Sequence, residues 1–137
     1  MKIKSSYIAG RNEVNLNNYI IVFIGAGLGG GCRYWFSAFI QKQFPPYFPL
    51  GTLAVNLIGS FILGLMIFGL DEKEMISPAL KLFIGIGFCG GFTTFSTFSF
   101  ETFNLIRNAE FLFAGLNILG NVALTILGIY CAYIITR

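Results

Sequence analysis

The residues best suited to chemistry in this chain lie in one uninterrupted string, from Gly90 to Ser99. Two adjacent glycines are followed by phenylalanines and by hydroxyl residues, namely Thr93, Thr94, Ser96, Thr97 and Ser99. No residue from Leu82 to Phe100 is charged, and about 20 apolar residues suffice to cross a hydrocarbon core as a helix. Hydroxyls and freed backbone groups are tolerated at that depth only where protein or water covers them. The string is therefore predicted to face a partner helix or a permeation path, and it need not form one continuous helix.

Phe95 and Phe98 within this string share a helix face. The chain holds 16 phenylalanines among 137 residues, so contact with lipid is the ordinary interpretation of any one of them. A benzene ring is electropositive at its edge. Two ring edges that face a gap are an alternative, because they attract a small anion without trapping it with a full charge.

A second candidate group lies in an earlier apolar segment. Thr52, Asn56 and Ser60 recur at intervals of one helical turn and so line one helix face. They form either a polar track beside a pore or hydrogen bonds between helices. Thr52 and Ser60 fit the second interpretation better. Asn56 fits the first, because a full amide in mid-span is costly without a dedicated partner.

Two charged residues accompany these apolar segments. Arg33 cannot lose its charge, so it either extends to water or meets an anion. Glu101 is predicted to lie at the end of its span, where accepting hydrogen bonds from hydroxyls or pairing with Arg107 is favoured over carrying protons.

Composition restricts the class of protein. With 137 residues, 11% charged and a mean hydropathy of +0.75, the chain departs from soluble domains, of which about 25% is charged. It is predicted to lie in the lipid bilayer of the cell membrane as a multi-pass protein. The chain has no histidine and no nucleophile–base pair, which argues against an enzyme, and its scattered basic residues argue against nucleic acid. The cysteines Cys32, Cys89 and Cys131 are interpreted as small apolar residues.

Charges and prolines divide the chain into a polar N-terminal extension, residues 1–18, and a four-span membrane domain, residues 19–137. We expect helices at Tyr19–Ile40, Leu50–Leu70, Ala79–Phe103 and Phe111–Thr136.

Orientation follows from lysines and arginines near the span ends. One side would hold Lys2, Lys4, Arg11, Lys73, Lys81 and Arg137, and the other Lys42 and Arg107. Without the extension the bias nearly vanishes, so the membrane domain itself has little preference for either orientation. Glycines at small-xxx-small spacing predict closely packed helices: Gly25 and Gly29, Gly27 and Gly31, Gly87 and Gly91.

Three motifs together resemble the CrcB/Fluc family of fluoride channels. They are Gly25-Ala26-Gly27 with Gly30, Arg33 and Tyr34; Gly51-Thr52-Leu53-Ala54-Val55-Asn56 with Gly59, Ser60 and Phe61; and Gly90 through Phe98. The resemblance covers the chain from about Tyr19 to Ile135, four spans in the family's order.

The resemblance implies an all-α, antiparallel, dual-topology homodimer in which the third span is broken at its middle. It implies fluoride-selective, passive conduction that relieves fluoride toxicity. The implied pathway contains Phe95 and Phe98 as ring edges, Asn56 as a donor, the hydroxyls of Ser96 and Thr97, and Arg33 in an aqueous vestibule. It also implies a central sodium ion held by the backbone carbonyls of Gly90 and Thr93 from both subunits.

One position departs from the family. Family members often have an aromatic hydroxyl where this chain places Asn117, with Asn121 and Thr125 following at one-turn intervals. Asn117 is therefore expected to continue the pathway with a different donor. Two alternatives to a channel stay open. A proton-coupled exporter of the small four-span type needs an acid deep in the first span, which this chain lacks, and a non-transporting assembly subunit would show no ion flux.

Overall fold

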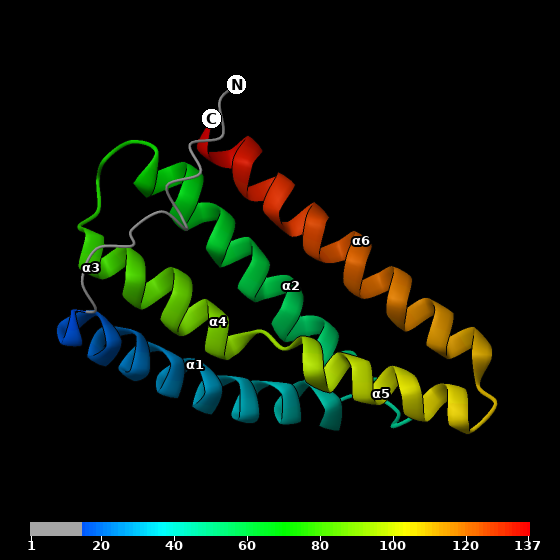
Figure 1. Cartoon of the computed structure of the whole chain (residues 1–137). Helices are drawn as coiled ribbons and strands as arrows, with labels where there is room; N and C mark the ends of the chain where they lie inside the picture. Colours follow the sequence, from blue (N-terminus) through cyan, green and yellow to red (C-terminus); the bar gives the residue numbers. More distant parts are fainter. Residues whose placement is uncertain (1–14) are drawn as a thin grey trace.

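The computed structural model describes residues 15–137, and four helical stretches of it are long and apolar enough to cross a membrane. The first is α1 (Leu16–Lys42), and the second is α2 (Leu50–Gly64) continued by the π-helical η1 (Leu65–Asp71). The third combines α3 (Pro78–Lys81), the π-helical η2 (Leu82–Cys89), α4 (Gly90–Phe92) and α5 (Phe95–Arg107). The fourth is α6 (Phe111–Thr136). The predicted four-span, all-α architecture is confirmed, and the third span is interrupted between α4 and α5 (Figure 1).

The start of α1 lies earlier in the chain than expected. Asn15 caps this helix, because its side chain accepts a hydrogen bond of 3.0 Å from the backbone N–H of Asn17. The last residues of the expected extension, 16–18, are therefore helical. The rest of that extension, residues 1–14, lies outside the described residues.

Glycines bring α1 into close contact with the third span. A Cβ added at Gly29 would lie 2.2 Å from the Phe88 carbonyl oxygen, and one at Gly91 would lie 2.3 Å from that of Ala26. Gly25 and Gly87 approach each other in the same way, with 3.0 Å between a Cβ built on either one and the Cα of the other. These backbones therefore pack where a methyl group has no room. Gly27 of the other expected pair has nothing within 4 Å of such a Cβ.

The second span packs against the fourth. Gly128 of α6 lies over Leu57, and Gly64 of α2 lies over Ala132. Val55 of α2 is completely buried. Figure 1 shows α2 between the third span and α6, so three of the spans contribute to one polar interior at the level of the break.

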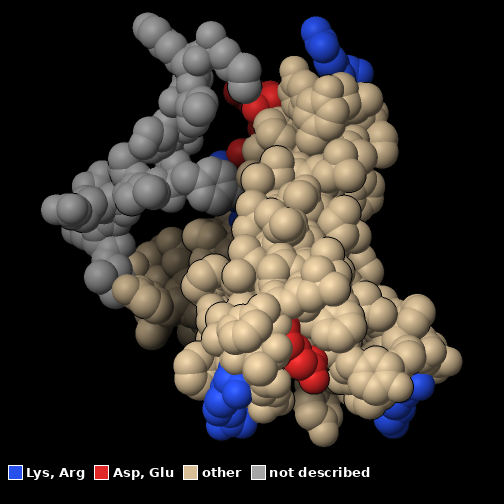
Figure 2. All heavy atoms as spheres, turned by 90° about the vertical axis from the view of Figure 1, so that its right-hand side faces the viewer, with Lys and Arg blue, Asp and Glu red and all other residues tan. Residues whose placement is uncertain are grey.

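Charged side chains gather toward the ends of the spans. Lys81 forms an ion pair of 2.7 Å with Asp71, and Lys73 donates a hydrogen bond of 2.8 Å to the carbonyl of Thr136. Figure 2 shows uncharged side chains across the middle of one face. This distribution is that of a multi-pass membrane protein.

Candidate functional site

The interruption of the third span is made by side chains that take over backbone hydrogen bonds. Thr93 and Thr94 have extended backbone conformations, with φ, ψ of −85°, 160° and −152°, 119°. In a continuous helix the Thr94 N–H would bond the Gly90 carbonyl, but here it donates to Asn56 Oδ1 at 2.7 Å. Likewise the Thr97 N–H donates to Thr94 Oγ1 at 3.1 Å instead of to the Thr93 carbonyl. The Gly90 and Thr93 carbonyls thereby lose their helical donors.

Asn56 has the hydrogen-bond partners that a buried amide in the middle of a span requires. Besides accepting from the Thr94 N–H, it donates through Nδ2 to the Thr94 carbonyl at 3.1 Å and to Asn121 Oδ1 at 2.9 Å. Its side chain is buried, and both amide hydrogens are committed. Asn56 therefore pairs with both backbone groups of Thr94, the N–H and the C=O, in the way that a neighbouring strand would.

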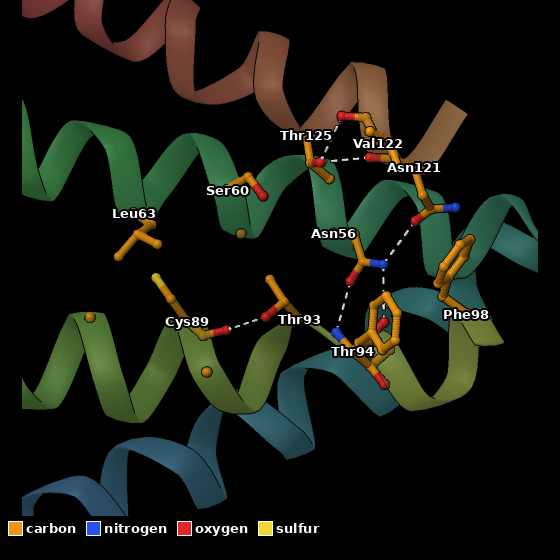
Figure 3. Close-up of a pocket in the computed structure, with 14 residues that line it drawn as sticks. Asn56, Ser60, Leu63, Cys89, Thr93, Thr94, Phe98, Asn121, Val122 and Thr125 are labelled. Atoms are coloured by element: carbon orange, nitrogen blue, oxygen red, sulfur yellow. Dashed lines mark hydrogen bonds between the residues drawn. The ribbon is translucent and has the colours of Figure 1, made fainter. Parts of the chain in front are cut away.

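A cavity of about 340 Å³ opens beside this pairing. Figure 3 shows Asn56, Thr94, Asn121 and Phe98 gathered on one side of it, with Leu63 and Cys89 farther along. Other lining residues include Ser60, Gly90, Thr93, Phe95 and Thr125. The cavity thus joins the break to polar groups of α2 and α6.

Phe95 and Phe98 of the string both line this cavity. Their ring centroids are 5.4 Å apart, with an angle of 54° between the ring planes. Phe98 is 9% exposed, whereas Phe95 is 79% exposed on the described chain. Phe98 is thus buried within the described chain, and Phe95 extends from its surface.

A second cavity, of about 290 Å³, contains Arg33. Ser37, Thr52 and Thr97 also line it, and Thr94 lines both cavities. The Arg33 guanidinium donates through Nη1 to the Thr93 carbonyl at 3.3 Å. A permanent positive charge therefore lies next to the break.

The structure separates the expected site residues by position. Asn56, Phe95 and Phe98 line the first cavity with Gly90 and Thr93, and Arg33 and Thr97 line the second. Ser96 is exposed, with its Oγ 3.2 Å from Thr94 Oγ1. Asn117 is completely buried and is not among the lining residues of either cavity. Hydrogen bonds connect it to residues of the first cavity through Asn121 and, by way of Thr102, through Phe98.

Glu101 contacts Thr52, a residue that was expected to form hydrogen bonds between helices. Thr52 Oγ1 donates to Glu101 Oε1 at 2.8 Å, which agrees with the interpretation of Glu101 as an acceptor for hydroxyls. Its Oε2 is buried and has no hydrogen-bond partner among the described residues.

Sequence reasoning missed Thr94 and Thr102 as individual site residues. Thr94 bonds the Asn56 side chain through both backbone groups, and the buried Thr102 contacts Asn117. The spacing could have indicated Thr102, because it lies one helical turn after Phe98 and so shares its helix face.

Comparison with known proteins agrees with this geometry. The profile of a family described as "CrcB-like protein, Camphor Resistance (CrcB)" matches residues 20–133. A Pyrococcus abyssi protein named fluoride-specific ion channel FluC is 45% identical over 130 residues, which cover 90% of this chain and 99% of that protein. Proteins of the same name from Methylocella silvestris and Shewanella sp. strain ANA-3 are 38% and 43% identical over 120 and 115 residues. Those matches cover 86% and 84% of this chain, and 92% of each relative. Because the profile extends from α1 to α6, this chain belongs to the CrcB family.

Proposed function

We propose that this chain forms a fluoride-selective channel that lets cytoplasmic fluoride leave the cell passively and so relieves fluoride toxicity. The observation that carries the proposal is the cavity at the break, where Phe95, Phe98 and the amides of Asn56 and Asn121 meet, in a chain whose relatives are named fluoride-specific ion channels.

The chemistry of the cavity suits a small, strongly hydrated anion. Ring edges and amide or hydroxyl donors replace water without offering a full countercharge that would hold the ion. Both amide hydrogens of Asn56 are used within the protein, so an ion would be met by Asn56 in exchange for one of these bonds. Arg33, at the neighbouring cavity, would raise the local concentration of anions.

The pathway is proposed to be completed in an antiparallel homodimer. Phe95 lines the cavity but is 79% exposed on the described chain. Gly27, Gly31 and Gly90 are exposed, and no atom of residues 15–137 lies within 4 Å of a Cβ added to them, apart from the glycine's own neighbours and helix. Small exposed residues allow another helix to approach closely. A second copy with inverted orientation would bring the two breaks together and cover the Phe95 side chain of each copy.

A sodium ion at the centre of that dimer is proposed on the chemistry of the freed carbonyls. Gly90 and Thr93 both lack their helical donors, and uncharged carbonyl oxygens suit a hard monovalent cation. The Thr93 carbonyl also accepts from Arg33, but a carbonyl oxygen has a second lone pair. No group of His, Cys, Asp and Glu suited to a metal occurs within residues 15–137, so backbone oxygens are the ligands proposed.

Efflux of fluoride from liposomes, followed with a fluoride electrode, tests the proposal. Purified protein should release fluoride in preference to chloride and without an imposed proton gradient. Comparable chloride efflux would contradict fluoride selectivity, and a strict requirement for a proton gradient would favour the exporter. A complete lack of flux would favour the assembly subunit.

A further inference from the structure

A line of hydrogen bonds runs from the break through α2 and α6 and back to α5. We call it the amide ladder and define it by Thr94, Asn56, Asn121, Asn117, Thr102 and Phe98. The Thr94 N–H donates to Asn56 at 2.7 Å, Asn56 Nδ2 to Asn121 Oδ1 at 2.9 Å, and Asn121 Nδ2 to Asn117 Oδ1 at 3.0 Å. Asn117 Nδ2 then donates to Thr102 Oγ1 at 2.9 Å, and Thr102 Oγ1 to the Phe98 carbonyl at 2.8 Å.

The direction of the ladder is determined by its backbone groups. The Thr94 N–H only donates and the Phe98 carbonyl only accepts. Asn121 Nδ2 also donates to the backbone carbonyl of Asn117 at 3.1 Å, which fixes the orientation of its amide. Every side chain between the ends therefore accepts from one neighbour and donates to the next. Such chains of bonds polarise one another, and they are most valuable where every member is satisfied.

Two members of the ladder, Asn117 and Thr102, are buried away from the cavities. Asn117 is 0% exposed and Thr102 is 7% exposed. Neither is among the residues that line the two cavities at the break. A group in this place does not meet a permeating ion directly, so Asn117 and Thr102 act through residues that do.

Those residues are the phenylalanines at the start of α5. The ladder begins at Thr94, the residue that caps α5, and it ends at Phe98, one turn into the same helix. Between these points it is anchored on α2 through Asn56 and on α6 through Asn117 and Asn121. The start of α5 is thereby tied to α2 at Thr94, and farther along the helix α5 is tied to α6 at Thr102, whose hydroxyl also bonds the Phe98 carbonyl. Without these bonds the extended Thr93–Thr94 segment would allow the start of α5 to tilt.

We propose that Asn117 and Thr102 are positioning residues, which set the selectivity of the channel by holding Phe98 and the first turn of α5. This inference rests on the proposed function. Loss of a ladder bond would let the ring of Phe98 shift. A shifted ring both weakens contact with fluoride and admits larger anions.

Thr102→Val is the sharpest test, because it exchanges the hydroxyl for a methyl group and breaks the ladder between Asn117 and Phe98. Fluoride efflux per assembled dimer should fall about tenfold, the equivalent of about 1.4 kcal/mol, and the fluoride-to-chloride flux ratio should fall as well. Thr102→Ser keeps the hydroxyl and should restore both to within about twofold. Thr136→Val is the matched control, because the Thr136 hydroxyl donates only to carbonyls of its own helix near the far end of α6.

Asn117→Leu opens the same ladder from the other helix. The double variant Asn117→Leu with Thr102→Val should be no worse than the poorer single variant, since a ladder already broken loses nothing more. Unchanged flux ratios in both single variants, or strictly additive losses, would overturn the proposal. Failure of both single variants to assemble would also overturn it, because the ladder would then serve folding and not position.

Hydrogen exchange separates this inference from the proposed function. Thr102→Val should increase amide exchange over residues 94–102, and Thr136→Val should not. This readout needs no ion flux. If the unmodified protein releases no fluoride, the proposed function fails while the exchange data still report on the ladder. Unchanged exchange over residues 94–102 would show that the ladder does not hold α5.

Discussion

At the scale of single residues, the amide of Asn56 is the centre of the site. One side chain satisfies both backbone groups of Thr94 and reaches Asn121 on another span. An amide combines donors and an acceptor, and no other uncharged side chain of this size pairs with a peptide unit in this way. The cost of burying it is met by these bonds.

Asn56→Asp is expected to abolish fluoride efflux. The carboxylate cannot donate to the Thr94 carbonyl, and its negative charge would repel an anion in the cavity. Each lost or unsatisfied bond costs about 1–3 kcal/mol, so thermal stability in detergent should fall too. The matched control is Asn108→Asp, at the exposed C-terminal end of α5, which should retain both. Wild-type efflux from Asn56→Asp would show that the amide is dispensable.

Phe95→Ile and Phe98→Ile test the ring edges. Isoleucine keeps an apolar side chain but removes the electropositive edge. Fluoride efflux should fall by about tenfold or more in each variant, while the dimer still purifies. Phe103→Ile lies on the same helix with 59% exposure and lines neither cavity at the break, so it should behave like the unmodified protein. If all three variants conduct equally, the phenylalanines of the string serve only to contact lipid.

At the scale of elements, the two parts of the third span pack against different neighbouring helices. α4 packs on α1 through glycines, and α5 is held by α2 and α6 through polar side chains. The extended Thr93–Thr94 segment joins these two regions and exposes carbonyls that a helix would have used.

Gly91→Ala is expected to separate α1 from the third span. The new methyl group would lie 2.3 Å from the Ala26 carbonyl oxygen, and such overpacking costs about 1–3 kcal/mol. Thermal melting in detergent should occur at a lower temperature than for the unmodified protein. Gly115→Ala, with nothing within 4 Å of the added Cβ, should melt at the same temperature or higher, because alanine favours the helix. Equal melting of the two variants would show that the contact yields easily.

Because the Gly90 and Thr93 carbonyls lack helical donors, we predict that they bind a sodium ion. An experimental structure of the dimer should show a buried ion surrounded only by oxygen atoms, those of Gly90 and Thr93 from both subunits. Replacing sodium by a large organic cation during purification should lower the melting temperature, because an ion that binds only the folded state stabilises it. A dimer with no such density and no dependence on sodium would eliminate this site.

At the scale of the whole molecule, the described chain leaves part of its candidate site exposed. Its four spans leave Phe95 and several glycines of α1 uncovered. The described part of the chain has basic residues close to both ends of its spans, Lys73, Lys81 and Arg137 on one side and Lys42 and Arg107 on the other. Such a near balance gives little reason to insert in a single orientation.

An antiparallel dimer predicts labelling from both sides of the membrane. The test uses a cysteine engineered at the N-terminus, in a background without Cys32, Cys89 and Cys131. An impermeant reagent should label about half of the protein in intact cells and the other half only after the cells are opened. Lys2, Lys4 and Arg11 favour a cytoplasmic N-terminus, so their neutralisation should shift the balance if they contribute. Exclusive protection in intact cells would establish one orientation and contradict the antiparallel homodimer.

Sequence alone determined the spans, the break and the family. Hydropathy and charge placed the helices to within a few residues, because a bilayer requires a minimum apolar length. The glycine pair followed by hydroxyls allowed an interruption, since those residues loosen a helix and offer alternative partners to its backbone. The break at the middle of the third span was implied by the family resemblance. That Thr52, Asn56 and Ser60 lie on one helix face also followed from their spacing, because residues one turn apart share a face.

Only the tertiary structure decided the partners of these groups. Asn56 bonds the Thr94 peptide across 38 positions of the chain, and Asn117 is buried against Thr102 and not beside the cavities. Spacing within one helix states which residues share a face, but it does not state which helix that face meets. The packing of α2 and α6 around the break settles that question, because buried amides need hydrogen-bond partners and glycines let the spans approach closely enough to supply them.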